Sequence, residues 1–179
     1  MNKTILCWQM MGLVFATIAG TVLHFLFAWS GSNVAVALLS AVNESIWEHM
    51  KLLFYPMTAF ALMEYFAWGK EQRNFWCIKL AGILLGLALI PVLYYTYTGI
   101  LGTSAHWFNI TIFFLVAGVV YWVETKLFQK GCTCLIGTGL TVALICLLVV
   151  VFTIFTFLPP RIPLFQDPIS GMYGFIKGE

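Results

Sequence analysis

Charged residues are scarce in this chain, and their scarcity excludes an ordinary soluble domain. Only 9% of the 179 residues are Asp, Glu, Lys or Arg, whereas 61% are hydrophobic and 17% are aromatic. Soluble globular domains contain about 25% charged residues. None of the four charged types occurs between Thr4 and Asn43, and the mean hydropathy of the chain is +0.95. The composition therefore predicts an integral membrane protein.

Features of nucleic-acid-binding and multidomain proteins are also missing. The chain has no run of Lys and Arg and no nucleic-acid-binding motif, so we expect no nucleic acid as a partner. A membrane span needs roughly 20 apolar residues. A chain of 179 residues therefore has room for about five spans and no second, soluble domain, and the lipid bilayer is its expected surrounding.

Apolar runs predict an all-α, polytopic membrane protein with about five transmembrane helices. The predicted spans are residues 5–29, 45–68, 75–97, 107–122 and 135–158. Residues 34–42 are apolar too, but nine residues of helix cover only about 14 Å, so we expect a short half-helix on the outer side. Residues 1–158 thus form the predicted bundle, and we interpret the first span as uncleaved rather than as a signal peptide. Residues 159–179 contain several prolines and glycines, which predicts an irregular extracytoplasmic tail.

Basic residues predict how the bundle is oriented in the membrane. With five spans and a cytoplasmic N-terminus, six of them fall on the inner side and three on the outer side. The inner set is Lys3, Lys70, Arg73, Lys79, Lys126 and Lys130, and the outer set is Lys51, Arg161 and Lys177. This excess agrees with the positive-inside rule, so we expect a cytoplasmic N-terminus and an extracytoplasmic C-terminus.

The five cysteines do not predict a disulfide framework. Cys7, Cys77, Cys132 and Cys134 fall at or near the inner side, and Cys146 falls within the last span. Cytoplasmic thiols are normally kept reduced. Cys132 and Cys134 form a C-x-C pattern that could hold a metal, but a single pattern of this kind is weak, and we interpret them as a reduced pair.

The outer face gathers the polar residues that could carry chemistry. The stretch AVNESIWEHMK contains Glu44, Glu48 and His49, and the predicted topology adds His24 and His106 on the same side. Histidine and carboxylate together are a usual ligand set for zinc and related divalent ions. The predicted metal ligands are His24, His49 and His106. Glu44 or Glu48 is the predicted general base that acts on a bound water.

The same stretch also has a purely structural interpretation. Ser45 and Glu48 are spaced as a capping box at the start of a helix, and Glu48 and Lys51 are spaced for an ion pair. If Glu48 serves in both, Glu44 becomes the better partner for the histidines. The competing hypothesis is a buried hydrogen-bond network, in which His24 helps to tie three spans together.

Three further residues complete the candidate set. Glu64 lies near the inner end of the second span, where it could carry protons in a transporter, but we favour a carboxylate that reaches water or Lys70. Arg161 and Asp167 lie in the tail, which we expect to fold over the outer cluster as a lid. Such a lid either brings one of these residues to the cluster or is held only by apolar contacts.

Three strings carry a family resemblance, namely HFLFAWSG from His24, NESIWEHMK from Asn43 and PPRIPLFQDPISGMYG from Pro159. Together they resemble a bacterial family of small multi-pass membrane proteins that is known only as a domain of unknown function. The resemblance spans nearly the whole chain and implies a membrane-embedded fold without assigning catalytic residues. A looser similarity links the chain to ceramidase-like membrane hydrolases, which hold zinc with histidines and an acid. It is limited because the third and fifth spans contain no histidine.

Two classes of function remain. The first is a metal-dependent membrane hydrolase that acts on a lipid or another amphiphile through His24, His49, His106 and Glu44. The second is a non-enzymatic module that binds or transports a ligand or ion, or that stabilises the bundle. A third, less specific possibility is a partner subunit of a larger complex. The sequence alone does not choose between an enzyme and a binding protein, and it specifies no oligomeric state.

Overall fold

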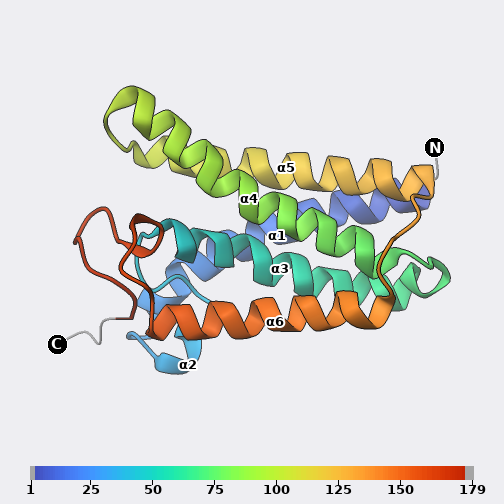
Figure 1. Ribbon diagram of the computed structural model, residues 1–179, viewed down its shortest axis with the longest axis horizontal. Helices are drawn as coiled ribbons and strands as arrows, with labels where there is room; N and C mark the ends of the chain where they lie inside the picture. The colour runs from blue at the N-terminus through green and yellow to red at the C-terminus, as the bar shows by residue number, and fades with distance from the viewer. Residues whose placement is uncertain (1–2, 176–179) are drawn as a thin grey trace.

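The described part of the chain, residues 3–175, folds in this computed structural model into five long α-helices joined by short elements (Figure 1). The long helices are α1 (Lys3–Trp29), α3 (Ile46–Ala67), α4 (Phe75–Leu101), α5 (His106–Lys130) and α6 (Thr138–Phe157), and successive ones run in opposite directions. The short elements are α2 (Val34–Ala37) and the 3₁₀ turns η1 (Gly69–Glu71) and η2 (Pro163–Phe165). The predicted all-α class is confirmed. Lys177 and the rest of residues 176–179, at the end of the predicted tail, lie outside the described residues.

Within the described residues, four helices are long and apolar enough to cross a membrane: α1, α4, α5 and α6. They agree with a polytopic membrane protein. The remaining long helix, α3, has 22 residues and packs against α1, α4 and α5. It carries Glu48, Lys51 and Glu64, and all three of these charged side chains are buried. The helices around α3 therefore shield its charges from lipid.

The ends of α4 and α5 extend four and eight residues beyond the predicted spans. α4 and α5 run on to Leu101 and Lys130, whereas the predicted spans end at residues 97 and 122. Each helix ends at a glycine in the left-handed conformation, Gly102 with φ 70° and Gly131 with φ 62°, which is a common way to end a helix. The last turns of α5 stay helical because they are packed into the bundle, where Glu124 is fully buried.

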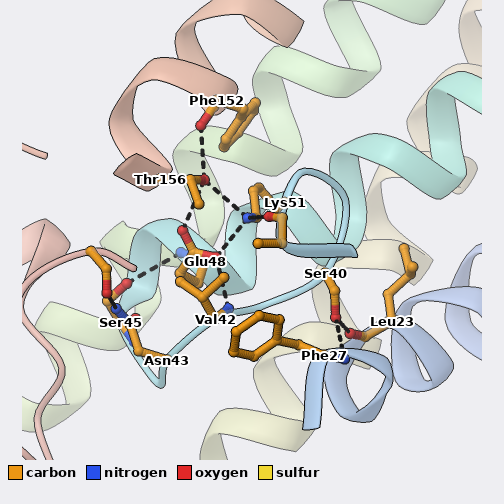
Figure 2. A network of polar contacts seen from close by, with 12 residues as sticks. Leu23, Phe27, Ser40, Val42, Asn43, Ser45, Glu48, Lys51, Phe152 and Thr156 are labelled. Carbon is orange, nitrogen blue, oxygen red and sulfur yellow. Dashed lines mark hydrogen bonds and ion pairs between the residues drawn. The ribbon is translucent and has the colours of Figure 1, made fainter. Parts of the chain in front are cut away.

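Helix α3 begins at the predicted cap. Ser45 is the N-cap residue, and its hydroxyl accepts a hydrogen bond from the Glu48 amide at 3.4 Å. The reciprocal half of the capping box is replaced by other contacts: the Ser45 amide donates to Asn43 Oδ1, and the Glu48 carboxylate accepts from the Val42 amide at 3.1 Å (Figure 2). Because Asn43 satisfies the Ser45 amide, the Glu48 carboxylate is left to pair with Lys51.

The structure joins one pair of cysteines for which the sequence analysis predicted no disulfide. Cys77, in the first turn of α4, and Cys134, in the connection from α5 to α6, form a disulfide. Cys132 is a free thiol, as are Cys7 and Cys146. The joined cysteines are 57 residues apart, so it is the packing of α4 beside α5 that brings them together. The start of α4 and the connection from α5 to α6, which carry the bond, lie at the end of the bundle where α1 begins (Figure 1).

The tail lies over the opposite end of the bundle, where α1 ends and α3 begins (Figure 1). Phe165 is buried, and its ring centroid lies 4.8 Å from that of Trp47 in α3. The Asn43 side chain donates to the carbonyl oxygen of Gly174 at 3.0 Å. Apolar and main-chain contacts therefore hold the tail against the bundle.

Candidate functional site

His24, Glu44 and His49 meet at the end of the bundle where α1 ends and α3 begins. His24 Nε2 lies 3.6 Å from Glu44 Oε1, and His49 Nε2 lies 3.5 Å from Glu44 Oε2. One ligand atom from each residue falls within 4.8 Å of the other two. The two imidazole rings thus face different oxygens of one carboxylate, and these are atom types that bind divalent cations.

Ser40 fixes the connection that carries Glu44. Its hydroxyl accepts a hydrogen bond from the Phe27 amide at 3.0 Å and donates to the Leu23 carbonyl oxygen (Figure 2). Both partners belong to the last turns of α1, next to His24. The connection after α2 is therefore attached to α1, and Glu44 follows it directly into the start of α3.

The ring of His49 is oriented by its own helix. His49 Nδ1 lies 2.8 Å from the carbonyl oxygen of Ser45. A carbonyl oxygen only accepts hydrogen bonds, so Nδ1 must carry the proton and donate. In the neutral ring, Nε2 then holds the lone pair, and it is Nε2 that faces Glu44. This is the tautomer in which histidine binds a metal through Nε2, with the other nitrogen held by a backbone carbonyl.

The cluster is only partly covered. The exposed fraction of the side chain is 17% for His24, 19% for His49 and 30% for Glu44. His24 Nδ1 is buried and has no hydrogen-bond partner among the described residues. An ion or a small polar molecule can therefore reach the cluster, while packing still restrains the rings.

A cavity of about 150 Å³ adjoins the cluster between α1, α3 and α5. His24, His49 and His106 all line it. The other lining residues are Gly20, Thr21, Phe25, Leu52, Asn109, Ile110, Phe113 and Phe114. Phe25, Ile110 and Phe114 also lie on the outer surface of the bundle, each nearly half exposed. These residues belong to α1 and α5, two of the helices that are long and apolar enough to cross a membrane, so the wall of the cavity reaches the apolar outer surface of these helices.

A family model matches residues 1–175, which is nearly the whole chain. The chain belongs to a family of unknown function, DUF6512. The resemblance to an uncharacterised family is thereby confirmed. No curated protein and no solved structure matches the chain. For this member of DUF6512, the geometry of the site itself is the basis for a functional proposal.

In this DUF6512 protein, Glu48 belongs to a different network from Glu44. Its buried carboxylate lies 2.7 Å from Lys51 Nζ and accepts hydrogen bonds from the Val42 amide and from the Thr156 hydroxyl, the latter at 3.2 Å (Figure 2). Lys51 donates in turn to Thr156 and to the Ala37 carbonyl oxygen. These contacts occupy the carboxylate, so Glu48 ties α2, α3 and α6 together instead of facing the histidines.

The other predicted site residues lie away from the cluster. Asp167 is buried in the tail, where its carboxylate accepts from the Ile169 amide at 2.9 Å and from the Ser170 hydroxyl at 2.6 Å. Arg161 is exposed on the tail. Glu64 lies near the far end of α3. Of the predicted set, the structure brings together His24, Glu44 and His49, with His106 on the wall of the same cavity.

The contact expected between Glu64 and water or Lys70 is not the one observed. Glu64 is fully buried and pairs with Lys79, which also lies 2.7 Å from Glu124. The sequence analysis counted Lys79 only as an inner-side basic residue and gave Glu124 no role. A signal was present nonetheless: these three charges fall within about two turns of the same end of the bundle, on three different helices.

Proposed function

We propose that this DUF6512 protein is an integral membrane metalloprotein that hydrolyses a lipid or another amphiphile. One observation carries the proposal: the spacing of His24, Glu44 and His49. The nitrogen–oxygen distances of 3.5 and 3.6 Å are longer than a good hydrogen bond. They are close to the roughly 3.3 Å that separates two ligands of a tetrahedral zinc ion with bonds of about 2.0 Å. The two distances end on different oxygens of Glu44, and the three ligand atoms lie within 4.8 Å of one another, so a divalent ion, with Zn²⁺ as the first choice, would draw the three side chains closer together.

The donor types suit a catalytic ion rather than a purely structural one. Two histidines and one carboxylate are a known ligand set for catalytic zinc, in which the fourth position is left for water. A water bound in this way becomes a nucleophile near neutral pH. His49 has the hydrogen-bonded Nδ1 that commonly supports such ligands.

The cavity supports an amphiphilic substrate. Its wall is mainly apolar and reaches the outer surface at Phe25, Ile110 and Phe114. Its polar end is formed by His24 and His49 of the cluster. An acyl chain would enter from the bilayer side, and a polar bond such as an ester or amide would then lie next to the metal.

The roles of the remaining polar residues follow from their contacts. Glu48 is already paired with Lys51 in a buried network, so we do not assign it as the general base. Glu44 is assigned to the metal because each of its oxygens faces a histidine. His106 is exposed and lines the same cavity, so we assign it to proton transfer at the substrate.

The experiment is elemental analysis of the protein purified in detergent, without chelators and with an affinity tag that contains no histidine. The variants are Glu44→Gln and the double variant His24→Ala/His49→Ala. His106→Ala is the matched control, because it removes a histidine from the same cavity without touching the cluster. Size-exclusion chromatography and thermal unfolding show which variants are folded.

We expect about one zinc or related ion per wild-type chain and per His106→Ala chain, and loss of the ion from folded Glu44→Gln. A fluorogenic ester with a medium-length acyl chain then measures hydrolysis. Metal-free wild-type protein, or an ion that survives both cluster variants, would contradict the metal site. Stoichiometric metal without cleavage of any ester or amide amphiphile would contradict the hydrolase and leave a metal-binding module.

A further inference from the structure

A second polar cluster, made of Gln9, Glu64, Lys79 and Glu124, lies at the opposite end of the bundle from the histidines. Its members come from α1, α3, α4 and α5. Lys79 Nζ lies 2.7 Å from Glu124 Oε2 and also contacts Glu64 Oε2, and Gln9 Nε2 donates to Glu64 Oε1 at 2.9 Å. All four residues are at most 2% exposed. The cluster is therefore closed off from solvent, and the site proposed above does not use it.

Aromatic rings enclose the ammonium group of this cluster. The ring centroids of Phe75, Tyr121 and Phe128 lie 5.6 to 5.7 Å from Lys79 Nζ. Trp68 packs in turn against Phe75 and Phe128, with ring centroids 5.6 and 5.0 Å apart. Aromatic faces attract a cation, so the surroundings of Lys79 are built for its charged form.

The charges of the cluster do not cancel. Among the described residues, the charged and titratable groups that face it are Glu64 from α3, Lys79 from α4, and Glu124 and Tyr121 from α5. Helix α1 contributes the neutral Gln9. Two ionised carboxylates beside one ammonium would leave one excess negative charge in a fully buried site. An unpaired buried charge of this kind is strongly unfavourable.

We propose that this cluster is a proton-binding site that holds one exchangeable proton on Glu124. Glu64 Oε1 accepts from Gln9, and Glu64 Oε2 lies in the ion pair with Lys79, although it makes no further hydrogen bond among the described residues. Glu124 Oε1 has neither a hydrogen bond nor an ion-pair contact among the described residues, so a proton added to this oxygen displaces no existing contact. A Cβ atom at Gly82 would lie 2.8 Å from Glu124 Cδ, so the glycine provides the room that this carboxyl group occupies. Carboxyl groups buried between membrane helices are typical of proton relays.

Infrared spectroscopy of the protein in detergent near neutral pH tests the proposal, because the carbonyl stretch of a protonated carboxyl group is absent from a carboxylate. Wild type is compared in H₂O and D₂O with Glu124→Gln and Glu64→Gln. Glu71→Gln is the matched control, since Glu71 is exposed in η1 at the same end of the bundle.

We expect wild type to show a carbonyl band whose intensity corresponds to one protonated carboxyl group per molecule. This band should shift in D₂O and should persist in Glu71→Gln. It should vanish in Glu124→Gln, which removes the protonated group. It should also vanish in Glu64→Gln, because Glu124 then becomes the only carboxylate partner of Lys79. A wild-type spectrum indistinguishable from that of Glu124→Gln would overturn the proposal. So would the failure of Glu124→Gln to fold, because an amide of the same shape should replace a neutral carboxyl group without loss of the fold.

Discussion

Lys51 and Thr156 are hydrogen-bonded, with 3.0 Å between Nζ and Oγ1, although 105 residues separate them along the chain. The same ammonium lies 2.7 Å from Glu48 and donates to the Ala37 carbonyl oxygen (Figure 2). Lys51 and Glu48 are both fully buried. One ion pair therefore joins α2, α3 and α6 at the end of the bundle that also carries the histidines.

Lys51→Met should destabilise the protein strongly, because it leaves the Glu48 carboxylate buried without a counter-charge. Removing one partner of a buried pair costs about 3–5 kcal/mol. Unfolding in detergent, followed by circular dichroism during a denaturant titration, measures the change. The double variant Glu48→Gln/Lys51→Met should lose less stability than Lys51→Met alone, and exposed Glu71→Gln should stay near wild type. If the double variant lost as much stability as Lys51→Met or more, the unpaired charge of Glu48 would not be the cause of the destabilisation.

Local sequence rules predicted the start of this network well. The spacing of Ser45 and Glu48 indicates a helix start, and Ser45 is the N-cap. The spacing of Glu48 and Lys51 indicates an ion pair, which is present. Thr156 could not be found in this way, because its contact depends on how α6 packs against α3 and not on any spacing along the chain.

Topology predicted which end of the bundle each polar residue occupies but not its partner. His24, Glu44 and His49 were expected on one face, yet their approach to within 4.8 Å depends on the attachment of Ser40 to α1. Glu64 was expected near water or Lys70. Its side chain is buried with Lys79 instead, because the choice among nearby cations is made by packing between helices.

Phe165→Ala should loosen the tail without unfolding the bundle. The ring of Phe165 is buried against Trp47, and truncating a buried phenylalanine costs about 3–5 kcal/mol. The tail contains exposed Arg161, so faster trypsin cleavage after this residue reports the detachment. Ile169→Ala is the control, because Ile169 is 79% exposed and its truncation should leave the cleavage rate unchanged. Equal rates in wild type and Phe165→Ala would mean that other contacts hold the tail.

Gly20→Ala should destabilise the contact of α1 with α3 and α5. A Cβ atom at Gly20 would lie 2.6 Å from the Leu52 carbonyl oxygen and 2.6 Å from Phe113 Cζ, so the helices would have to move apart. Overpacking of this kind costs about 1–3 kcal/mol. Gly118→Ala is the matched control, since a Cβ atom there meets open space and alanine is the better helix former by about 1 kcal/mol. Thermal unfolding should therefore shift down for Gly20→Ala and not for Gly118→Ala, and equal shifts would rule out the steric explanation.

The disulfide between Cys77 and Cys134 tests the predicted orientation, because it lies at the end of the bundle assigned to the cytoplasm. Lys51 and Lys79 are buried in ion pairs and carry no weight as loop charges. Within the described residues, five exposed basic residues remain at this end of the bundle, whereas the other end has one, Arg161, so the positive-inside rule still places this end in the cytoplasm.

We therefore expect the Cys77–Cys134 pair to be reduced in cells and to form the bond on exposure to air. Protein alkylated at the moment of lysis should carry five labels by mass spectrometry, and air-exposed protein should carry three, on Cys7, Cys132 and Cys146. Three labels at lysis would place this end outside the cytoplasm and reverse the orientation, because the bond would then have formed in an oxidising compartment.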